Sequence, residues 1–345
     1  MKIKNINILI IIVLFSFVGN IFGGPKNKYG LSAARELLIP VGSVSTALGG
    51  ANLASVNGVD ALYWNPSGLS ILSGKTGEVL FSNQIYIADI NIVYFAGAYK
   101  IPNFGSLALS VNALNFGDIP VTTVTNPEGT GETFSPTYLT TGVSYARAMT
   151  DRISFGTTVK VIYEKISRES STGIAFDFGL NYDVIGSGLR FGVALRNIGP
   201  SMSFSGPDLE QFFQPPETPA GTQPEPRAIE LADFELPTSL SLGLSYDLRL
   251  DQKNNLIGHG TFQNNSFSTD DYNLGLEYNF NKIVYLRGGY QITDDTGDNN
   301  TFTGVTFGAG FKYSASNSFN IGFDYAYRLA NRFEDNQFFT INLGF

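Results

Sequence analysis

A two-residue alternation of apolar and polar side chains runs through most of this chain, from about residue 79 to its last residue. In the final segment Phe339, Ile341, Leu343 and Phe345 share one face, and Thr, Asn and Gly occupy the other. Because successive side chains of a β-strand point to opposite faces, this alternation indicates strands with one apolar face. The polar faces carry Gly, Ser, Asn and charged residues, as lumen faces do in membrane barrels. The pattern predicts an all-β transmembrane β-barrel in an outer membrane of the Gram-negative type.

The composition agrees with this fold class. The chain has 38 Gly, 28 Phe and 17 Tyr, only 15% charged residues and no Cys. Glycines and aromatics in such excess fit membrane strands with aromatic girdles, whereas a cytosolic enzyme usually carries more charge. The absence of Cys excludes disulfides and Cys-ligated metals. The net charge of −8 argues against a nucleic-acid partner, and no cofactor is indicated.

The first 24 residues are expected to form a signal peptide. Lys2 and Lys4 supply a basic start, Ile8 to Val18 an apolar stretch, and Gly23 and Gly24 the small residues before cleavage. The apolar stretch is short for a spanning helix, although an uncleaved N-terminal anchor is the alternative. A secreted chain without spanning helices enters a membrane only as a barrel.

Period-two runs bounded by Gly, Asn, Asp and Pro predict about fourteen antiparallel strands within a barrel domain over residues 77–345. The predicted strands cover residues 77–87, 89–101, 104–115, 137–149, 152–166, 171–185, 188–198, 237–248, 254–264, 270–281, 283–293, 303–314, 316–328 and 335–345.

Short and long connections between these strands alternate. The odd-numbered connections include every long one, 116–136, 199–236 and 294–302. Short periplasmic turns and long outer loops are the rule in such barrels. The alternation supports the strand count and predicts that both termini lie on the periplasmic side.

The strand charges fall on the predicted lumen face, which avoids about 2–4 kcal/mol for an Arg or Lys at the lipid midplane. The predicted lumen set includes Lys160, Glu164, Arg190, Arg196, Glu277, Arg287, Lys312, Asp324 and Arg328. The predicted lipid-facing set includes Ile174, Phe176, Phe178, Leu180, Leu240, Leu242, Phe319, Ile321 and Phe323.

Residues 25–76 precede the strands and do not alternate. Small residues and turn formers predict short helices and tight turns there. A fourteen-stranded barrel is wider than the eight-stranded barrels that side chains alone fill. We therefore expect this segment to be an N-terminal plug, or hatch, inside the lumen, with a periplasmic extension as the alternative.

The plug carries a motif that resembles a known family. The motif comprises residues 45–51 and 61–69, with Gly49, Gly50, Trp64, Asn65, Pro66 and Gly68 as its marked positions. Together with residues 129–134 and 142–152, Lys160 and the Gly199 turn, it is similar to the PorV/PorQ family of the wider FadL-like group. Ser67 stands where that group's Asn-Pro-Ala-Gly-like turn has Ala. The resemblance covers most of the first 200 residues and implies fourteen strands with an N-terminal plug.

The resemblance implies one function and leaves others open. A PorV/PorQ-type barrel binds or shuttles secreted proteins at the cell surface in type IX secretion. FadL-like transport of a hydrophobic small molecule through the lumen and a lateral opening is the alternative. It predicts an apolar pocket between Leu48, Leu53, Leu62 and the inner faces of the first strands. A passive structural barrel without any ligand is the third possibility.

The loop over residues 199–236 is the candidate partner-binding surface. The loop contains seven acidic residues and one basic residue, Arg227, and it is rich in Pro. Aromatic residues set among acids could dock a secreted cargo or a basic partner, while a solvated loop is the plain alternative. The candidate residues are Asp208, Glu210, Phe212, Phe213, Glu217 and Glu225.

No catalytic constellation is indicated. The single His, His259, lies in a predicted strand with no nucleophile nearby in sequence, and a lumen or girdle position is expected for it. The acidic pairs Asp270-Asp271 and Asp294-Asp295 match no calcium loop. Phe345 is the expected signal for the barrel-assembly machinery, which, with outer-membrane lipid, completes the predicted partners.

Overall fold

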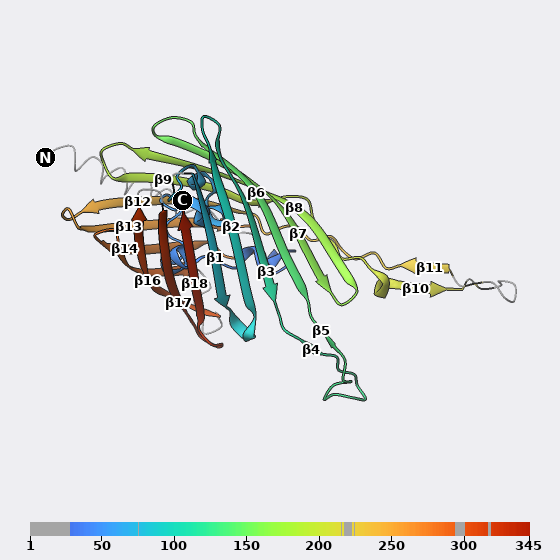
Figure 1. The fold of residues 1–345 in the computed structure, drawn as a ribbon. Helices are drawn as coiled ribbons and strands as arrows, with labels where there is room; N and C mark the ends of the chain where they lie inside the picture. The colour runs from blue at the N-terminus through green and yellow to red at the C-terminus, as the bar shows by residue number, and fades with distance from the viewer. Residues whose placement is uncertain are drawn as a thin grey trace.

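Fourteen antiparallel strands close into one barrel in the computed structural model, which describes residues 28–74, 76–214, 216, 223, 225–293, 301–316 and 319–345 (Figure 1). Each strand pairs with its neighbours along the chain, and β18 pairs with β1 to close the sheet. The strands are β1 (Gly77–Ile85), β2 (Asn91–Ile101), β3 (Gly105–Asn115), β6 (Thr137–Ala148), β7 (Ile153–Ile166), β8 (Glu169–Val184), β9 (Leu189–Ile198), β12 (Ser239–Arg249), β13 (Asn254–Asn265), β14 (Asp271–Phe280), β15 (Val284–Thr293), β16 (Phe302–Ser316), β17 (Phe319–Ala330) and β18 (Asn336–Gly344).

The predicted strand count and order are confirmed. The largest boundary error is at the start of β17, which begins at Phe319 instead of residue 316. The alternation of short turns with long loops is also present, so the barrel has a long-loop end and a short-turn end. The connection over residues 294–300 lies outside the described residues.

The outer wall of the barrel is apolar, as the alternation predicts. Leu109, Val143 and Leu286 are each more than half exposed, and each alternates with a buried or half-buried neighbour that faces inward. The predicted lipid-facing residues are likewise exposed, among them Ile174, Phe178, Leu240, Ile321 and Phe323. Among the described residues, no helix is both long and apolar enough to cross a membrane.

The N-terminal segment forms short helices inside the barrel, as predicted. These are η3 (Arg35–Leu38), α2 (Ser43–Ala47), η4 (Gly58–Asp60), α3 (Ala61–Trp64) and η5 (Pro66–Ser70). They lie within the ring of strands (Figure 1), where α2 contacts β15 to β18 and η5 contacts β3 and β6 to β8. We call residues 28–74 the plug.

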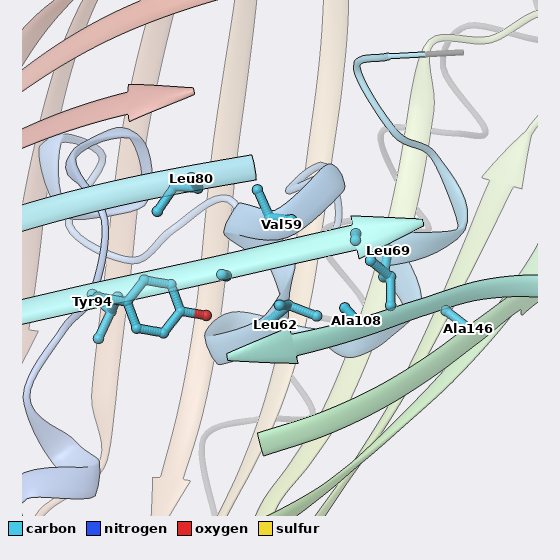
Figure 2. Packing of buried hydrophobic residues seen from close by; sticks show 10 residues of the cluster. Val59, Leu62, Leu69, Leu80, Tyr94, Ala108 and Ala146 are labelled. Atoms are coloured by element: carbon cyan, nitrogen blue, oxygen red, sulfur yellow. The ribbon is translucent and has the colours of Figure 1, made fainter. Parts of the chain in front are cut away.

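An apolar cluster joins the plug to one side of the wall. Val59, Leu62 and Leu69 of the plug pack against Leu80 and Tyr94 of the first two strands (Figure 2). Small wall residues, Ala96, Ala98, Ala108 and Ala146, complete the cluster. Full burial of one such Val or Leu contributes roughly 1.5–3 kcal/mol, so the cluster favours the plug inside the barrel.

The plug enters from the long-loop end. Lys28 forms an ion pair with Glu235 of the longest loop at 3.2 Å. The backbone N–H of Gly30 donates to Phe267 O at 3.1 Å, and that of Ala33 donates to Glu235 O at 3.0 Å. The chain then passes through the lumen and leaves at the short-turn end to begin β1 at Gly77.

The sequence predicts that both ends of the chain lie on the periplasmic side. Phe345 lies at the short-turn end, where its N–H donates to Gly77 O at 2.9 Å. The described part of the plug begins at Lys28, at the long-loop end, because strand alternation carries no information on a segment threaded through the lumen. The chain's N-terminus and the expected signal peptide over residues 1–24 lie outside the described residues.

Surface labelling in whole cells should show this path, since the chain has no Cys of its own. A Leu31→Cys variant places a thiol at a side chain that is 53% exposed at the long-loop end. We expect it to react with a membrane-impermeant maleimide in intact cells. An Asn103→Cys variant, in an exposed short turn, should react only after the outer membrane is broken. The reverse labelling pattern would contradict the path.

Candidate functional site

The plug rests on strand glycines that face the lumen. A Cβ built on any of them would come closer than 3.0 Å to a plug atom, a distance that real side chains essentially never adopt. At Gly289 the obstacle is the backbone of Leu48 and Gly49, and at Gly156 it is the backbone of Pro66. The glycines of this seat are Gly156 of β7, Gly179 of β8, Gly192 of β9, Gly243 of β12, Gly275 of β14, Gly289 of β15 and Gly308 of β16.

The seat occupies neighbouring strands on both sides of β13. Gly156 pairs directly with Gly179, and Gly275 pairs directly with Gly289, on neighbouring strands. Gly192 likewise pairs with Gly243. A strand glycine often marks a place where another backbone approaches closely, and here that backbone is the plug.

Polar wall residues satisfy the backbone of the plug. Thr261 Oγ1 donates to Ala51 O at 2.9 Å, and Thr306 Oγ1 donates to Ala47 O at 3.2 Å. A buried carbonyl without a partner costs about 1–3 kcal/mol, so these bonds support the closed position.

Three of the six marked motif residues, Asn65, Pro66 and Gly68, lie together at the start of η5. Asn65 is fully buried, and its Nδ2 donates to Leu53 O at 3.0 Å and to Asn181 Oδ1 of β8 at 2.8 Å. Asn65 Oδ1 accepts a hydrogen bond from the Ser67 hydroxyl at 2.8 Å. This bond gives a local reason for Ser67 at the position where the FadL-like turn has Ala. Pro66 lies on Gly156, and Gly68 lies on the Val56 carbonyl.

The other three motif residues line a cavity. Trp64 donates its Nε1–H to Val41 O at 3.0 Å, and its ring lies against Gly50. Gly49 and Gly50 have φ of 64° and 76°, a region that favours glycine. With Trp64 they form part of the outer cavity, a space of about 190 Å³ on the long-loop side of the plug.

The outer cavity combines an apolar wall with two guanidinium groups. Leu37, Leu38, Pro40, Tyr63 and Trp64 supply the apolar wall. Arg196 of β9 and Arg328 of β17 also line the cavity, together with Asp271 and several amides.

Arg196 is held in place, but not all of its N–H groups have hydrogen-bond partners among the described residues. Its Nη2 donates to Gln263 Oε1 at 2.8 Å, and its guanidinium lies 5.5 Å from the Tyr63 ring and 6.0 Å from the Trp64 ring. Arg196 is 7% exposed, and among the described residues its Nε has no hydrogen-bond partner. A buried charged donor without a partner is costly, so an acceptor brought to this guanidinium would be favourable.

A second cavity lies on the short-turn side of the plug. This inner cavity has a volume of about 170 Å³, and its lining includes Asn52, Asp60, His259 and Lys312. It shares Asp60, Tyr285 and Lys312 with a neighbouring space of about 350 Å³ that lies among short-turn residues such as Lys282 and Asn342.

Two plug carboxyl groups have raised pKa values. Burial, followed by repulsion from Glu164, raises the pKa of Glu36 to about 8. Burial, followed by repulsion from Asp324, raises the pKa of Asp60 to about 7. Both groups are therefore uncharged in a larger fraction of molecules near neutral pH than exposed carboxyls are.

The three leucines of the expected apolar pocket, Leu48, Leu53 and Leu62, pack against the wall at separate places. Leu48 packs on Gly275 and Gly289, Leu53 packs on Gly243, and Leu62 joins the cluster on the first strands. The leucines fix the plug to three parts of the wall, and polar residues line much of both cavities.

The candidate partner loop forms a ribbon outside the barrel. Strands β10 (Glu210–Phe213) and β11 (Glu225–Ala228) pair with each other and project from the long-loop end (Figure 1). Asp208 anchors the ribbon through an ion pair with Arg168 at 2.8 Å. Phe212 is 71% exposed, whereas Phe213 stacks on Arg227 at 4.0 Å. Glu210 and Glu225 are exposed, and Glu217 lies outside the described residues.

His259 faces the lumen on β13. Its Nδ1 lies 2.9 Å from Ser245 Oγ and 3.2 Å from Ser55 Oγ. Both hydroxyls meet the same ring nitrogen, and among the described residues Nε2 has no partner. A catalytic triad instead needs an orienting acid on the second nitrogen.

The acidic pairs do not assemble a metal site among the described residues, where no cluster of three potential ligands is present. Asp270 and Asp271 accept hydrogen bonds from Asn264 and Asn265. Asp294 and Asp295 lie outside the described residues.

The sequence matches no known family model and no curated protein. Among solved structures, the CymD monoaromatic hydrocarbon channel is similar with a TM-score of 0.56 at 14% identity, over 91% of this chain and 97% of that chain. The Pseudomonas putida toluene transporter TodX has a TM-score of 0.54 at 13% identity, over 88% of this chain and 96% of that chain.

These likenesses show the fold. The protein is a closed fourteen-stranded β-barrel with an internal N-terminal plug, the fold of the CymD and TodX channels. The structural neighbours include transport channels, whereas no comparison points to the PorV/PorQ family or to type IX secretion.

The cavity residues are only partly evident from sequence. Alternation places Arg196 and Arg328 in the lumen, but they lie more than a hundred residues apart and in different strands. Their shared position near the long-loop ends of β9 and β17 is the signal that could have grouped them.

Exchange of Gly289 for Ala should displace the plug, because the new methyl group meets the backbone of Leu48 and Gly49. Overpacking of this kind costs about 1–3 kcal/mol, which should lower the midpoint of thermal unfolding of the purified barrel. Gly288→Ala is the matched control, since a Cβ there meets nothing within 4 Å. Equal midpoints for the two variants would argue against the glycine seat.

Proposed function

We propose that this protein is an outer-membrane channel for a small amphipathic molecule with a compact apolar body and an acidic group. The observation that carries the proposal is the outer cavity, in which the guanidinium of Arg196 lies beside the rings of Tyr63 and Trp64 and its Nε has no hydrogen-bond partner among the described residues. A guanidinium recognises a carboxylate strongly, and an aromatic wall accepts an apolar body.

The size of the cavity suits a single-ring molecule. A dry cavity of about 150 Å³ is known to accommodate benzene. The outer cavity has about 190 Å³, which leaves room for one polar group beyond a ring. The hydrocarbon channels CymD and TodX have the same fold, which supports a ligand of this size. The polar lining supports an acidic derivative over a plain hydrocarbon.

The apolar outer wall supports placement in the outer membrane. Transport then requires the plug to move, because residues 46–52 separate the two cavities: Thr46, Gly49 and Gly50 line the outer one, and Leu48 and Asn52 line the inner one. On this proposal, the observed position of the plug is that of a closed channel, and the outer cavity is the entry site.

Ligand binding can be measured through Trp64, because it is the single Trp of the chain and lines the outer cavity. Titration of the purified barrel with benzoate should change the Trp64 fluorescence in a saturable way. Arg196→Gln should raise the dissociation constant roughly tenfold to a hundredfold. This range corresponds to the loss of one hydrogen bond to a charged group, which contributes about 1.5–3 kcal/mol.

Arg152→Gln serves as the control, since Arg152 is exposed in a short turn far from the cavity. It should leave the affinity unchanged. An unchanged affinity in Arg196→Gln, or the absence of any saturable response in the unaltered protein, would count against the proposed entry site.

A second function, the docking of secreted proteins at the cell surface, is favoured by the ribbon of β10 and β11. Phe212 is exposed on the same ribbon as the acids Glu210 and Glu225, which form no ion pair within 4.0 Å among the described residues. An exposed aromatic among unpaired acids suits a basic, partly apolar segment of a cargo protein.

Exchange of Phe212 for Ser tests this second function. If the ribbon holds cargo, the variant should release more surface-attached protein into the culture medium than the unaltered barrel does. Val124→Ser is a matched control, because Val124 is fully exposed in a different outer loop. Equal release from the two variants would remove the support for docking.

A further inference from the structure

The inner cavity contains buried polar atoms without partners. His259 is 7% exposed and Asn52 is 3% exposed, and both line this cavity. Among the described residues, neither His259 Nε2 nor Asn52 Oδ1 forms a hydrogen bond. Buried polar groups in native proteins are nearly always bonded to protein or to something held by it.

The same cavity is lined by Lys312, a solvent-exposed lysine without an ion-pair partner among the described residues. Lys312 Nζ lies 5.1 Å from the centroid of the Tyr285 ring, and among the described residues no carboxylate oxygen lies within 4.0 Å of it. The neighbouring cation Arg287 is saturated, since it pairs with Glu277 at 2.6 Å and with Asp324 at 2.7 Å.

The other charged groups that line the cavity do not neutralise the positive charge of Lys312. Arg190 also lines the cavity and pairs with Asp183 at 3.3 Å, where both side chains are more than a third exposed. Asp60 is the one unpaired acid in the lining, and burial raises its pKa to about 7, which lowers its mean charge near neutral pH.

Apolar side chains complete the lining. Leu48 and Val44 come from the plug, and Ile257 comes from β13. The cavity thus has the same combination as the outer one: an apolar surface, a cation and unbonded polar atoms.

We propose that the inner cavity is a second binding site for a small organic acid, in which Lys312 receives the carboxylate beside His259, and Leu48 and Ile257 contact the apolar body. This inference rests on the proposed transport function and adds a relay to it. The molecule passes from Arg196 to Lys312 across the partition formed by residues 46–52, and it waits on the inner side before release.

The chain offers a separate reporter for each site. Trp64 is its single Trp and lines the outer cavity, and His259 is its single His and lines the inner one. In the full-length barrel purified without a histidine tag and labelled with ¹³C,¹⁵N-histidine, one imidazole gives one set of NMR signals. Titration with benzoate at fixed pH should shift these signals in a saturable way, and the uncharged analogue benzyl alcohol should not.

Lys312→Gln should raise the benzoate concentration at the midpoint of the His259 shift roughly tenfold or more, while the Trp64 fluorescence response stays unchanged. Lys312→Arg should restore most of the shift, which separates loss of charge from misfolding. Lys253→Gln, in an exposed short turn, is the matched control and should behave like the unaltered protein.

The outcomes distinguish this inference from the proposed function. A Trp64 response without a His259 shift overturns the inner site and leaves the entry site standing. The absence of both responses overturns both proposals. A His259 shift that is identical in Lys312→Gln also overturns the inner site, because the acid would then bind elsewhere.

Discussion

The contact between the plug backbone and the lumen-facing glycines of the wall is the interaction on which the rest of the structure depends. A barrel of this width is not filled by its own side chains. The plug fills it by laying main chain directly on strands, which only glycine permits at positions such as Gly156, Gly179 and Gly289. Hydroxyl groups of Thr261 and Thr306 then satisfy the plug carbonyls that this contact takes out of water.

The position of the plug creates two cavities instead of one pore. Residues 46–52 form a thin partition, with Gly49 and Gly50 on one side and Leu48 and Asn52 on the other. Each cavity has a cation beside apolar side chains. Ala47, Leu48, Ala51 and Asn52 of this partition are at most 3% exposed, so a shift of the partition breaks packing and hydrogen bonds with the wall.

Polar residues line much of both cavities, whereas a channel for a plain hydrocarbon would be expected to have apolar linings. Leu53 and Leu62 attach the plug to the wall, while Leu37, Leu38 and Leu48 share the cavity linings with arginines, amides and a lysine. A shared fold at 14% identity is compatible with a different ligand, because the ligand is selected by side chains and not by the strand order.

The sequence by itself determined the barrel, its fourteen strands and the face of each strand residue, because alternation is a local property that lipid on one side enforces. It also located the plug and the motif around Trp64 and Asn65. Only the tertiary structure decided that the plug starts at the long-loop end, that scattered glycines form one seat, and that Arg196 and Trp64 share a cavity. These features join residues far apart in the chain, and their pairing depends on how the wall curves around the plug, which no local pattern records.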